Sequence, residues 1–133
     1  MISARNYYGT VYTNAGAVLM ARVVGFSSEV LTRSQLLSGE YSIFRMDQRE
    51  ENQKIPVPGM TELALDLDKV FLNTLRKDSA WTLDEKGYNF RHILNVPEET
   101  FSEKSRFYQV EYTFFLVDTT YPPIRIQFRL FTV

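Results

Sequence analysis

The sequence predicts an antiparallel β-sandwich of about seven strands, with one short helix over about residues 69–77. Two observations predict this fold. Runs of alternating apolar and polar residues recur at intervals of roughly ten residues, and turn-forming residues separate them. The single segment with helical spacing is also too little to cover both faces of a parallel sheet.

The C-terminal runs 108–116 and 124–130 are the clearest strands. In each run apolar residues alternate with polar ones, and a short proline-containing turn joins the two runs. A period of two gives a strand one apolar face and one polar face. We therefore expect an antiparallel hairpin, and we expect its register to place Glu111 opposite Arg129 because this pairs opposite charges.

Three further segments have the composition of strands. Residues 88–94 alternate in the same way over a shorter run, and residues 39–46 are another candidate. Residues 18–26 are apolar on both parities apart from Arg22. This predicts a central strand that is covered on both faces.

Helical signals are limited to two places. Between residues 67 and 77 the apolar spacing changes to three and four, which predicts an amphipathic helix over about 69–77 with Asp68 or Asp66 as its N-cap. Thr32 and Gln35 have capping-box spacing, which predicts a single helical turn. The polar run 47–53 indicates a solvated loop, and no repeat or linker divides the chain. We expect one domain over residues 1–133.

Composition excludes several kinds of chemistry. The chain has no cysteine, which excludes disulfides, thiol nucleophiles and zinc ribbons, and its one histidine excludes a two-histidine metal site. No phosphate-binding, metalloprotease or nucleophile-elbow motif occurs. His92 could act as a general base, but it shares the apolar parity of its strand, so we favour a core or sheet-edge histidine that makes one hydrogen bond. We assign no catalytic residue, metal ligand or cofactor, and we expect a protein that is not an enzyme.

Charge and hydropathy bear on partners and location. Fifteen basic and sixteen acidic residues give a net charge of -1, so the sequence offers no electrostatic case for nucleic-acid binding. No apolar run has the length of a membrane span, and the first ten residues lack the apolar core of a signal peptide. We expect no membrane partner, and a cytoplasmic or virion-associated location is favoured.

Acidic residues gather in three places. They form the pairs Asp84-Glu85 and Glu98-Glu99 and the cluster of Asp47, Glu50 and Glu51. Paired carboxylates could serve glycoside hydrolysis or bind calcium, but the spacing of a calcium loop is missing. We favour solvated loop charge.

Nineteen aromatic residues, ten Phe, eight Tyr and one Trp, are many for this length. Most fall on the inward parity of the predicted strands, which indicates core packing. Phe115 and Phe131 instead take the polar parity, together with Arg125, Gln127 and Arg129. An exposed face of this composition resembles a protein interface, because aromatic residues and arginine are enriched there. We take these five residues as a candidate protein-contact patch, and the last strand could also be an open sheet edge.

Other aromatic residues leave a second function open. The inward-parity account does not cover the tyrosines near the N-terminus or Tyr121 in the last turn, and Trp81 is the only tryptophan. If these side chains are exposed, they could stack on sugars or small ligands. The alternative to a contact protein is therefore a carbohydrate- or small-ligand-binding module.

One stretch resembles known proteins. The pattern Trp81-Thr82-x-Asp84-x-x-Gly87-Tyr88-Asn89-Phe90-Arg91-His92, followed by Phe107-Tyr108-x-Val110-Glu111-Tyr112, is similar to one in small uncharacterised proteins of bacteriophage, prophage-like and planctomycete gene contexts. The resemblance covers about residues 70–112. It implies an immunoglobulin-like β-sandwich that serves as a structural or adaptor piece of a phage-like particle. We therefore expect a non-enzymatic protein that acts through contact with a protein partner or as a homo-oligomer.

Overall fold

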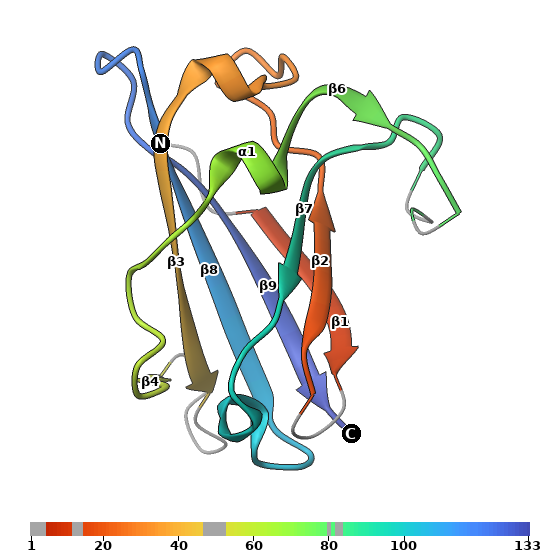
Figure 1. The fold of residues 1–133 in the computed structure, drawn as a ribbon, viewed down its shortest axis with the longest axis vertical. Coiled ribbons are helices and arrows are strands. Elements are labelled where there is room, and N and C mark those ends of the chain that lie inside the picture. Colours follow the sequence, from red (N-terminus) through yellow and green to blue (C-terminus); the bar gives the residue numbers. More distant parts are fainter. Residues whose placement is uncertain (1–4, 12–14, 47–52, 80, 82–83) are drawn as a thin grey trace.

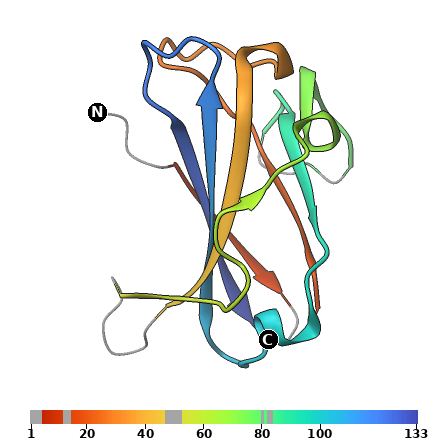
Figure 2. The same ribbon diagram turned by 60° about the vertical axis from the view of Figure 1, so that its left-hand side comes forward.

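Two β-sheets pack face to face in the computed structural model of the chain (Figure 1). The structure describes residues 5–11, 15–46, 53–79, 81 and 84–133, and of residues 5–11 it describes the backbone. Figure 2 shows the two layers from the side, with β3, β8 and β9 in one and β2 and β7 in the other. The predicted β-sandwich is confirmed.

The larger sheet has the strand order β1-β9-β8-β3-β4, and β5 also pairs with β3. All of its pairs are antiparallel except β1 with β9, which is parallel. The smaller sheet has the order β2-β7-β6. The strands are β1 (Arg5–Val11), β2 (Ala17–Ala21), β3 (Leu36–Met46), β4 (Lys54–Pro56), β5 (Leu63–Ala64), β6 (Phe71–Arg76), β7 (Tyr88–Leu94), β8 (Phe107–Leu116) and β9 (Ile124–Thr132).

This strand order is that of an immunoglobulin-like sandwich. The series β9-β8-β3-β4 corresponds to strands G, F, C and C′, and the series β2-β7-β6 corresponds to B, E and D. Tyr108, at the start of β8, has the position of the tyrosine corner of that fold. Its ring is 2% exposed, and its hydroxyl accepts a hydrogen bond from the backbone N–H of Glu103 at 3.2 Å. Val110, two residues further on, is fully buried where antibody domains carry a cysteine.

Aromatic rings from both sheets form the centre of the core. Phe90 of β7 packs edge-on against Tyr112 of β8 with ring centroids 4.9 Å apart, and Phe71 of β6 packs edge-on against Phe114 of β8 at 5.6 Å. Burial of each such side chain contributes about 1.5–3 kcal/mol, and each edge-to-face pair adds about 0.5–1.5 kcal/mol. The inward parity predicted for β7, β8 and β9 is confirmed.

The predicted helix over 69–77 is wrong in extent. Helix α1 spans Leu67–Val70, with Asp66 at its N-cap position, and residues 71–76 form strand β6. Phe71 is 4% exposed and pairs with Phe90 on β7. Phenylalanine, asparagine and threonine have low helix propensity, so the pairing with β7 determines the conformation of this segment.

The predicted register of the C-terminal hairpin is wrong by two residues. Glu111 lies opposite Gln127, and Arg129 lies opposite Gln109. A shift of two leaves every side chain on its face, so the apolar pattern could not distinguish the two registers. Within the turn, Asp118 Oδ1 accepts hydrogen bonds from both the backbone N–H and the hydroxyl of Thr120.

The segment over 18–26 is not a central strand covered on both faces. Strand β2 ends at Ala21, pairs with β7 alone among the described strands, and leaves Val18 50% exposed. Beyond its end the side chain of Asn89 takes the place of a partner strand. Its Oδ1 accepts from the N–H of Val23 at 2.7 Å, and its Nδ2 donates to the carbonyls of Val23 and Leu31 at 2.9 Å each.

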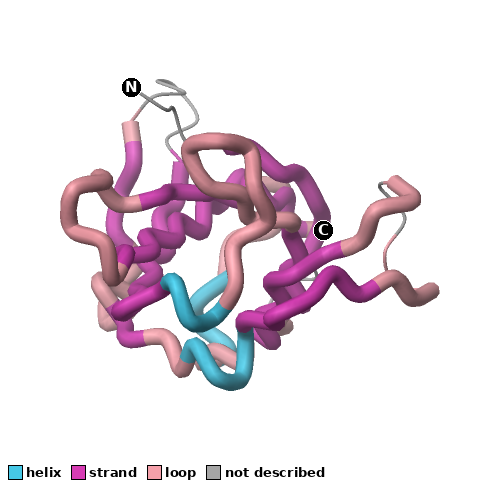
Figure 3. Tube along the Cα trace, turned by 90° about the horizontal axis from the view of Figure 1, so that it is seen from above, coloured by secondary structure: helices cyan, strands magenta, loops and turns pink. Residues whose placement is uncertain are grey.

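Short helical turns occupy the two ends of the sandwich. The turn predicted at Thr32 is confirmed as the 3-10 helix Arg33–Gln35, where Gln35 Oε1 accepts from the N–H of Thr32 at 2.9 Å. A second 3-10 turn spans Glu98–Phe101. Seen from above, the outer ends of β6 and β7 extend beyond the body of the sandwich (Figure 3). Of the predicted polar loop, residues 47–52 lie outside the described residues, as does Tyr12.

Candidate functional site

The outward side chains of β3, β8 and β9 form the face that carries the predicted contact residues, which we call the outer face. Strand β8 runs between the other two, so the registers align the side chains in three rows across the sheet. The rows are Phe44-Gln109-Arg129, Ser42-Glu111-Gln127 and Glu40-Thr113-Arg125. With Lys54 of β4 and Glu62, these rows line a wide depression of about 600 Å³.

A connected set of polar side chains orders the centre of the outer face. Glu111 Oε2 accepts from Lys54 Nζ and from Gln109 Nε2, both at 2.6 Å. Gln109 Nε2 also donates to Gln127 Oε1 at 3.2 Å, and Gln109 Oε1 accepts from Arg129 at 3.0 Å. Gln109 is 4% exposed, so this amide is a buried link between charged neighbours. Side chains held in this way lose little further freedom when a partner binds.

The aromatic residues of the patch lie at the two ends of the outer face. Phe131 packs against Phe107 with ring centroids 5.0 Å apart, and Phe107 is 47% exposed. Phe115 lies opposite Ser38, close to the other end of β8, and is half-buried. The five predicted residues therefore share one face. The structure separates their aromatic members by the polar set, where the sequence suggested one aromatic patch rimmed by arginine.

Four residues of this face, Phe107, Gln109, Glu111 and Lys54, lie outside the predicted contact patch, although the predicted hairpin placed Glu111 opposite Arg129. Gln109 and Glu111 have the outward parity of β8, so the alternation itself was the signal for them. Phe107 precedes the run that was recognised. Lys54 could not have been found, because it reaches Glu111 from a separate short strand and also lies 4.5 Å above the ring of Phe44.

The last strand is not an open sheet edge. Strand β9 pairs with β8 on one side and in parallel with β1 on the other. Strand β1 is far from β9 in the sequence, and no turn joins the two strands. Periodicity near β9 therefore could not predict that β1 pairs with it. The backbone of β9 from Ile126 to Phe131 is therefore already paired on both sides and is not available to a strand of another chain.

His92 bridges the two sheets from inside. Its Nδ1 lies 2.7 Å from the hydroxyl of Tyr112, and the edge of Tyr41 contacts its ring with centroids 4.9 Å apart. Burial lowers the pKa of His92 and raises the pKa of Tyr112 well above its usual value. The imidazole is neutral near pH 7 and satisfies a buried hydroxyl, which is the core arrangement that its parity predicted.

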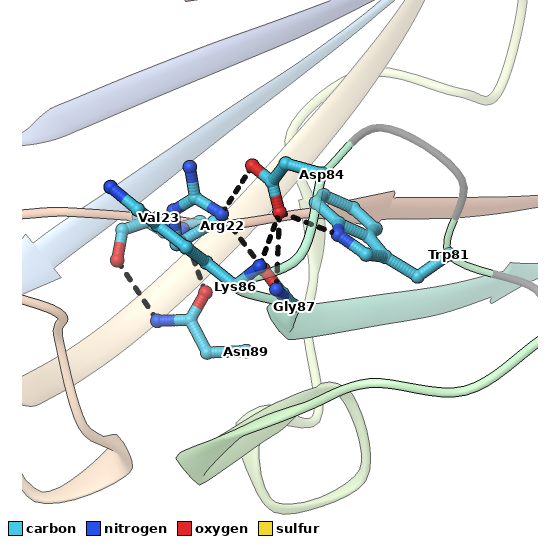
Figure 4. A network of polar contacts seen from close by, with 7 residues as sticks. All are labelled: Arg22, Val23, Trp81, Asp84, Lys86, Gly87 and Asn89. Atoms are coloured by element: carbon cyan, nitrogen blue, oxygen red, sulfur yellow. Dashed lines mark hydrogen bonds and ion pairs between the residues drawn. The ribbon is translucent and has the colours of Figure 1, made fainter.

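Asp84 is not simple solvated loop charge (Figure 4). Its Oδ1 accepts from the indole N–H of Trp81 at 2.9 Å and from the backbone N–H groups of Lys86 and Gly87, and its Oδ2 pairs with Arg22 at 2.6 Å. These hydrogen bonds lower the pKa of Asp84, and the bond from Trp81 makes the largest contribution. The carboxylate therefore connects the β6–β7 loop to the segment that follows β2 through hydrogen bonds and an ion pair.

The neighbourhood of Asp84 also corrects the expectation for Trp81. The indole is 8% exposed and packs on Tyr88 at 5.7 Å, so it is no exposed platform for a sugar. Gly87 has φ +100°, and a Cβ there would lie 2.4 Å from the carbonyl of Arg76. Of the other acidic residues, Glu85 pairs with Lys77 and Glu99 is exposed, whereas Asp47, Glu50, Glu51 and the side chain of Glu98 lie outside the described part.

The described residues contain no group of three or more His, Cys, Asp or Glu side chains that could hold a metal ion. Among the same residues, no helix has the length and apolar character needed to cross a membrane.

Strand order and the tyrosine corner define the class of the molecule as an immunoglobulin-like β-sandwich with an ordered polar outer face. Compared with known proteins, the chain matches no family model, no curated sequence and no solved structure.

Proposed function

We propose that this chain is a non-enzymatic structural or adaptor protein that acts through protein–protein contacts, and that its outer face is the contact surface. One observation carries the proposal. A hydrogen-bonded polar centre that includes Arg129 lines a depression of about 600 Å³, and an aromatic pair, the exposed Phe107 and the half-buried Phe131, lies at one end of the same face. Arginine and aromatic side chains are the types enriched at the centres of protein interfaces.

A second copy of the chain is the first partner to test. The outer face carries both signs of charge, Glu40, Glu62 and Glu111 with Lys54, Arg125 and Arg129, so a copy turned through a two-fold axis can match acidic to basic groups. The resemblance to proteins of phage-like contexts also favours a piece of a particle, and such pieces associate with copies of themselves.

Light scattering over a concentration series tests this proposal. The wild type is expected to exceed its monomer mass of 15.5 kDa, increasingly so at higher concentration. Phe131→Asp and Arg129→Glu are expected to shift the population toward monomer, because each places a negative charge in the contact. Lys69→Glu is the matched control, since this side chain lies on α1 and is 82% exposed. Its mass is expected to follow the wild type.

Two results would contradict the proposal. A wild type that keeps the monomer mass at the highest concentration overturns self-association. Association that both outer-face variants retain, while their circular dichroism matches the wild type, shows that another surface makes the contact.

One observation favours the alternative, a small-ligand-binding module. Tyr121 is 51% exposed and stacks on Phe26 beside a second cavity. A carbohydrate ligand would use these rings, since Trp81 is buried. Titration with glycans tests it by tyrosine emission, which is expected to change only if a sugar stacks on this pair.

A further inference from the structure

The second cavity shares no lining residue with the depression on the outer face, and the segments that line it lie at the end of the sandwich that carries α1 (Figure 1). It has a volume of about 320 Å³ and lies between the segment that joins β2 to β3 and the loop that joins β8 to β9. Leu31 and Leu116 are among its lining residues, and Val117 donates a backbone hydrogen bond to the carbonyl of Gln35 at 3.0 Å. This size is at the lower end of the range for ligand sites, which suits a single side chain.

A tight turn forms one wall of this loop-end cavity. The backbone N–H of Gly25 donates to the carbonyl of Glu29 at 2.8 Å, and Val24 bridges to Val30. The Glu29 side chain folds back over the turn, where its Oε2 accepts from the N–H of Ser27 at 2.9 Å. A Cβ on Gly25 would lie 2.0 Å from Glu29 Oε1, so glycine makes room for the carboxylate. The wall is therefore built by the backbone, and the carboxylate is fixed in it.

Two aromatic rings, one from each loop, also line this cavity. Phe26 and Tyr121 stack with centroids 5.3 Å apart and an angle of 16° between their planes. Phe26 is partly buried and Tyr121 is the outer ring. The stack closes the gap between the two loops and presents an aromatic ring beside the cavity.

The charged residues described in the lining are all acidic. Glu29 and Asp118 both line the cavity, and no lysine or arginine is among the described residues that line it. Arg33, on the same segment, turns to Asp68 with a contact of 2.8 Å. The hydrogen bonds from Thr120 lower the pKa of Asp118, so this carboxylate is ionised at neutral pH. Two anionic groups beside an aromatic ring suit a cation with an apolar stem.

We propose that the loop-end cavity binds an arginine side chain of a protein partner. The guanidinium group is planar, stacks on aromatic rings and donates to carboxylates, whereas the ammonium of lysine is more strongly hydrated. In the bound state its methylene stem lies against Leu31 and Leu116, and its plane lies along Tyr121. The carboxylates of Glu29 and Asp118 accept its N–H groups. This site shares no residue with the outer face, so an experiment can refute the arginine site without refuting the proposed contact surface, and the reverse.

A capped tripeptide, acetyl-Gly-Arg-Gly-amide, is the probe. Amide chemical shifts of the ¹⁵N-labelled protein follow its titration, and the same peptide with citrulline in place of arginine is the neutral control of equal shape. We expect saturable shifts at residues 25–29 and 116–121 with the arginine peptide alone. Asp118→Asn and Glu29→Gln keep their acceptor oxygens for Thr120 and Ser27, so they remove charge without removing the local bonds.

Each charge-neutral variant is expected to weaken binding about two- to five-fold, the range for one exposed ion pair. Asp66→Asn is the matched control, because it removes the same charge from the N-cap of α1 outside the cavity lining. Its affinity is expected to equal that of the wild type. Equal binding of the citrulline peptide, no saturable shift at the named residues, or unchanged affinity in both cavity variants would overturn the proposal.

Discussion

Asn89 and Asp84 show how single polar side chains hold this sandwich together where strand pairing ends. Asn89 is fully buried and supplies three hydrogen bonds to backbone groups of Val23 and Leu31. Asp84 gathers three N–H donors and a guanidinium group around one carboxylate. Both residues lie between Trp81 and His92, and both have a structural use there.

Replacing Asn89 with alanine should destabilise the fold strongly. The change leaves buried backbone groups of Val23 and Leu31 without partners, and each unsatisfied group costs about 1–3 kcal/mol. We expect a loss of about 3 kcal/mol or more in the free energy of unfolding, measured with urea. Asn95→Ala, at an exposed site, is the control and should change it by less than about 0.5 kcal/mol. Equal losses in the two variants would contradict the role of the Asn89 amide.

Asp84 should make stability depend on pH at the acid end. Its pKa is lower in the folded state than the unfolded value of about 3.9, so the folded protein binds a proton less readily. The stabilisation is therefore complete above about pH 4 and is lost as the pH falls through the folded pKa. Unfolding midpoints followed by Trp81 emission should fall more steeply below pH 4 in the wild type than in Asp84→Asn. Parallel curves would contradict this linkage.

At the scale of elements, pairing with neighbouring strands determined the conformations that the local sequence pattern could not predict. Alternation identified β7, β8 and β9 and their inward faces, because one residue of shift would expose the core. The same pattern misread residues 71–76, where helical spacing of apolar residues coexists with pairing to β7. It also missed the parallel partner β1 and the reach of Lys54 to Glu111, since both join segments far apart in the sequence.

The corner between β7 and β8 offers a test at this scale. Tyr108→Phe removes the hydroxyl that accepts from Glu103 and leaves the ring packed on Phe101 at 5.2 Å. We expect a loss of about 1 kcal/mol in the free energy of unfolding, the usual net value of one hydrogen bond. Tyr121→Phe, on an exposed ring, removes the same group and should cost less than about 0.5 kcal/mol. A Tyr108→Phe protein as stable as the wild type would show that the corner bond adds nothing.

At the scale of the whole molecule, the sandwich separates an aromatic core from two candidate binding surfaces. The five residues predicted from strand parity share the outer face, because outward parity on β8 and β9 follows directly from alternation. The polar network that orders this face depends on registers and on β4, which composition does not encode. The loop-end cavity is formed where the β2–β3 segment contacts the β8–β9 loop, and no periodic pattern in the sequence predicts a contact between two loops.

The central claim is that the outer face makes the protein contact, and a fluorophore placed on that face tests it most directly. The chain has no cysteine, so Arg125→Cys provides one labelling site at an exposed position of β9, and Lys69→Cys provides the control on α1. Unlabelled wild type is then added to each environment-sensitive conjugate. We predict a blue shift of emission with rising concentration for the label at 125 and none at 69. A mass that rises while the emission at 125 stays constant would contradict the account, because the copies would then meet through another surface.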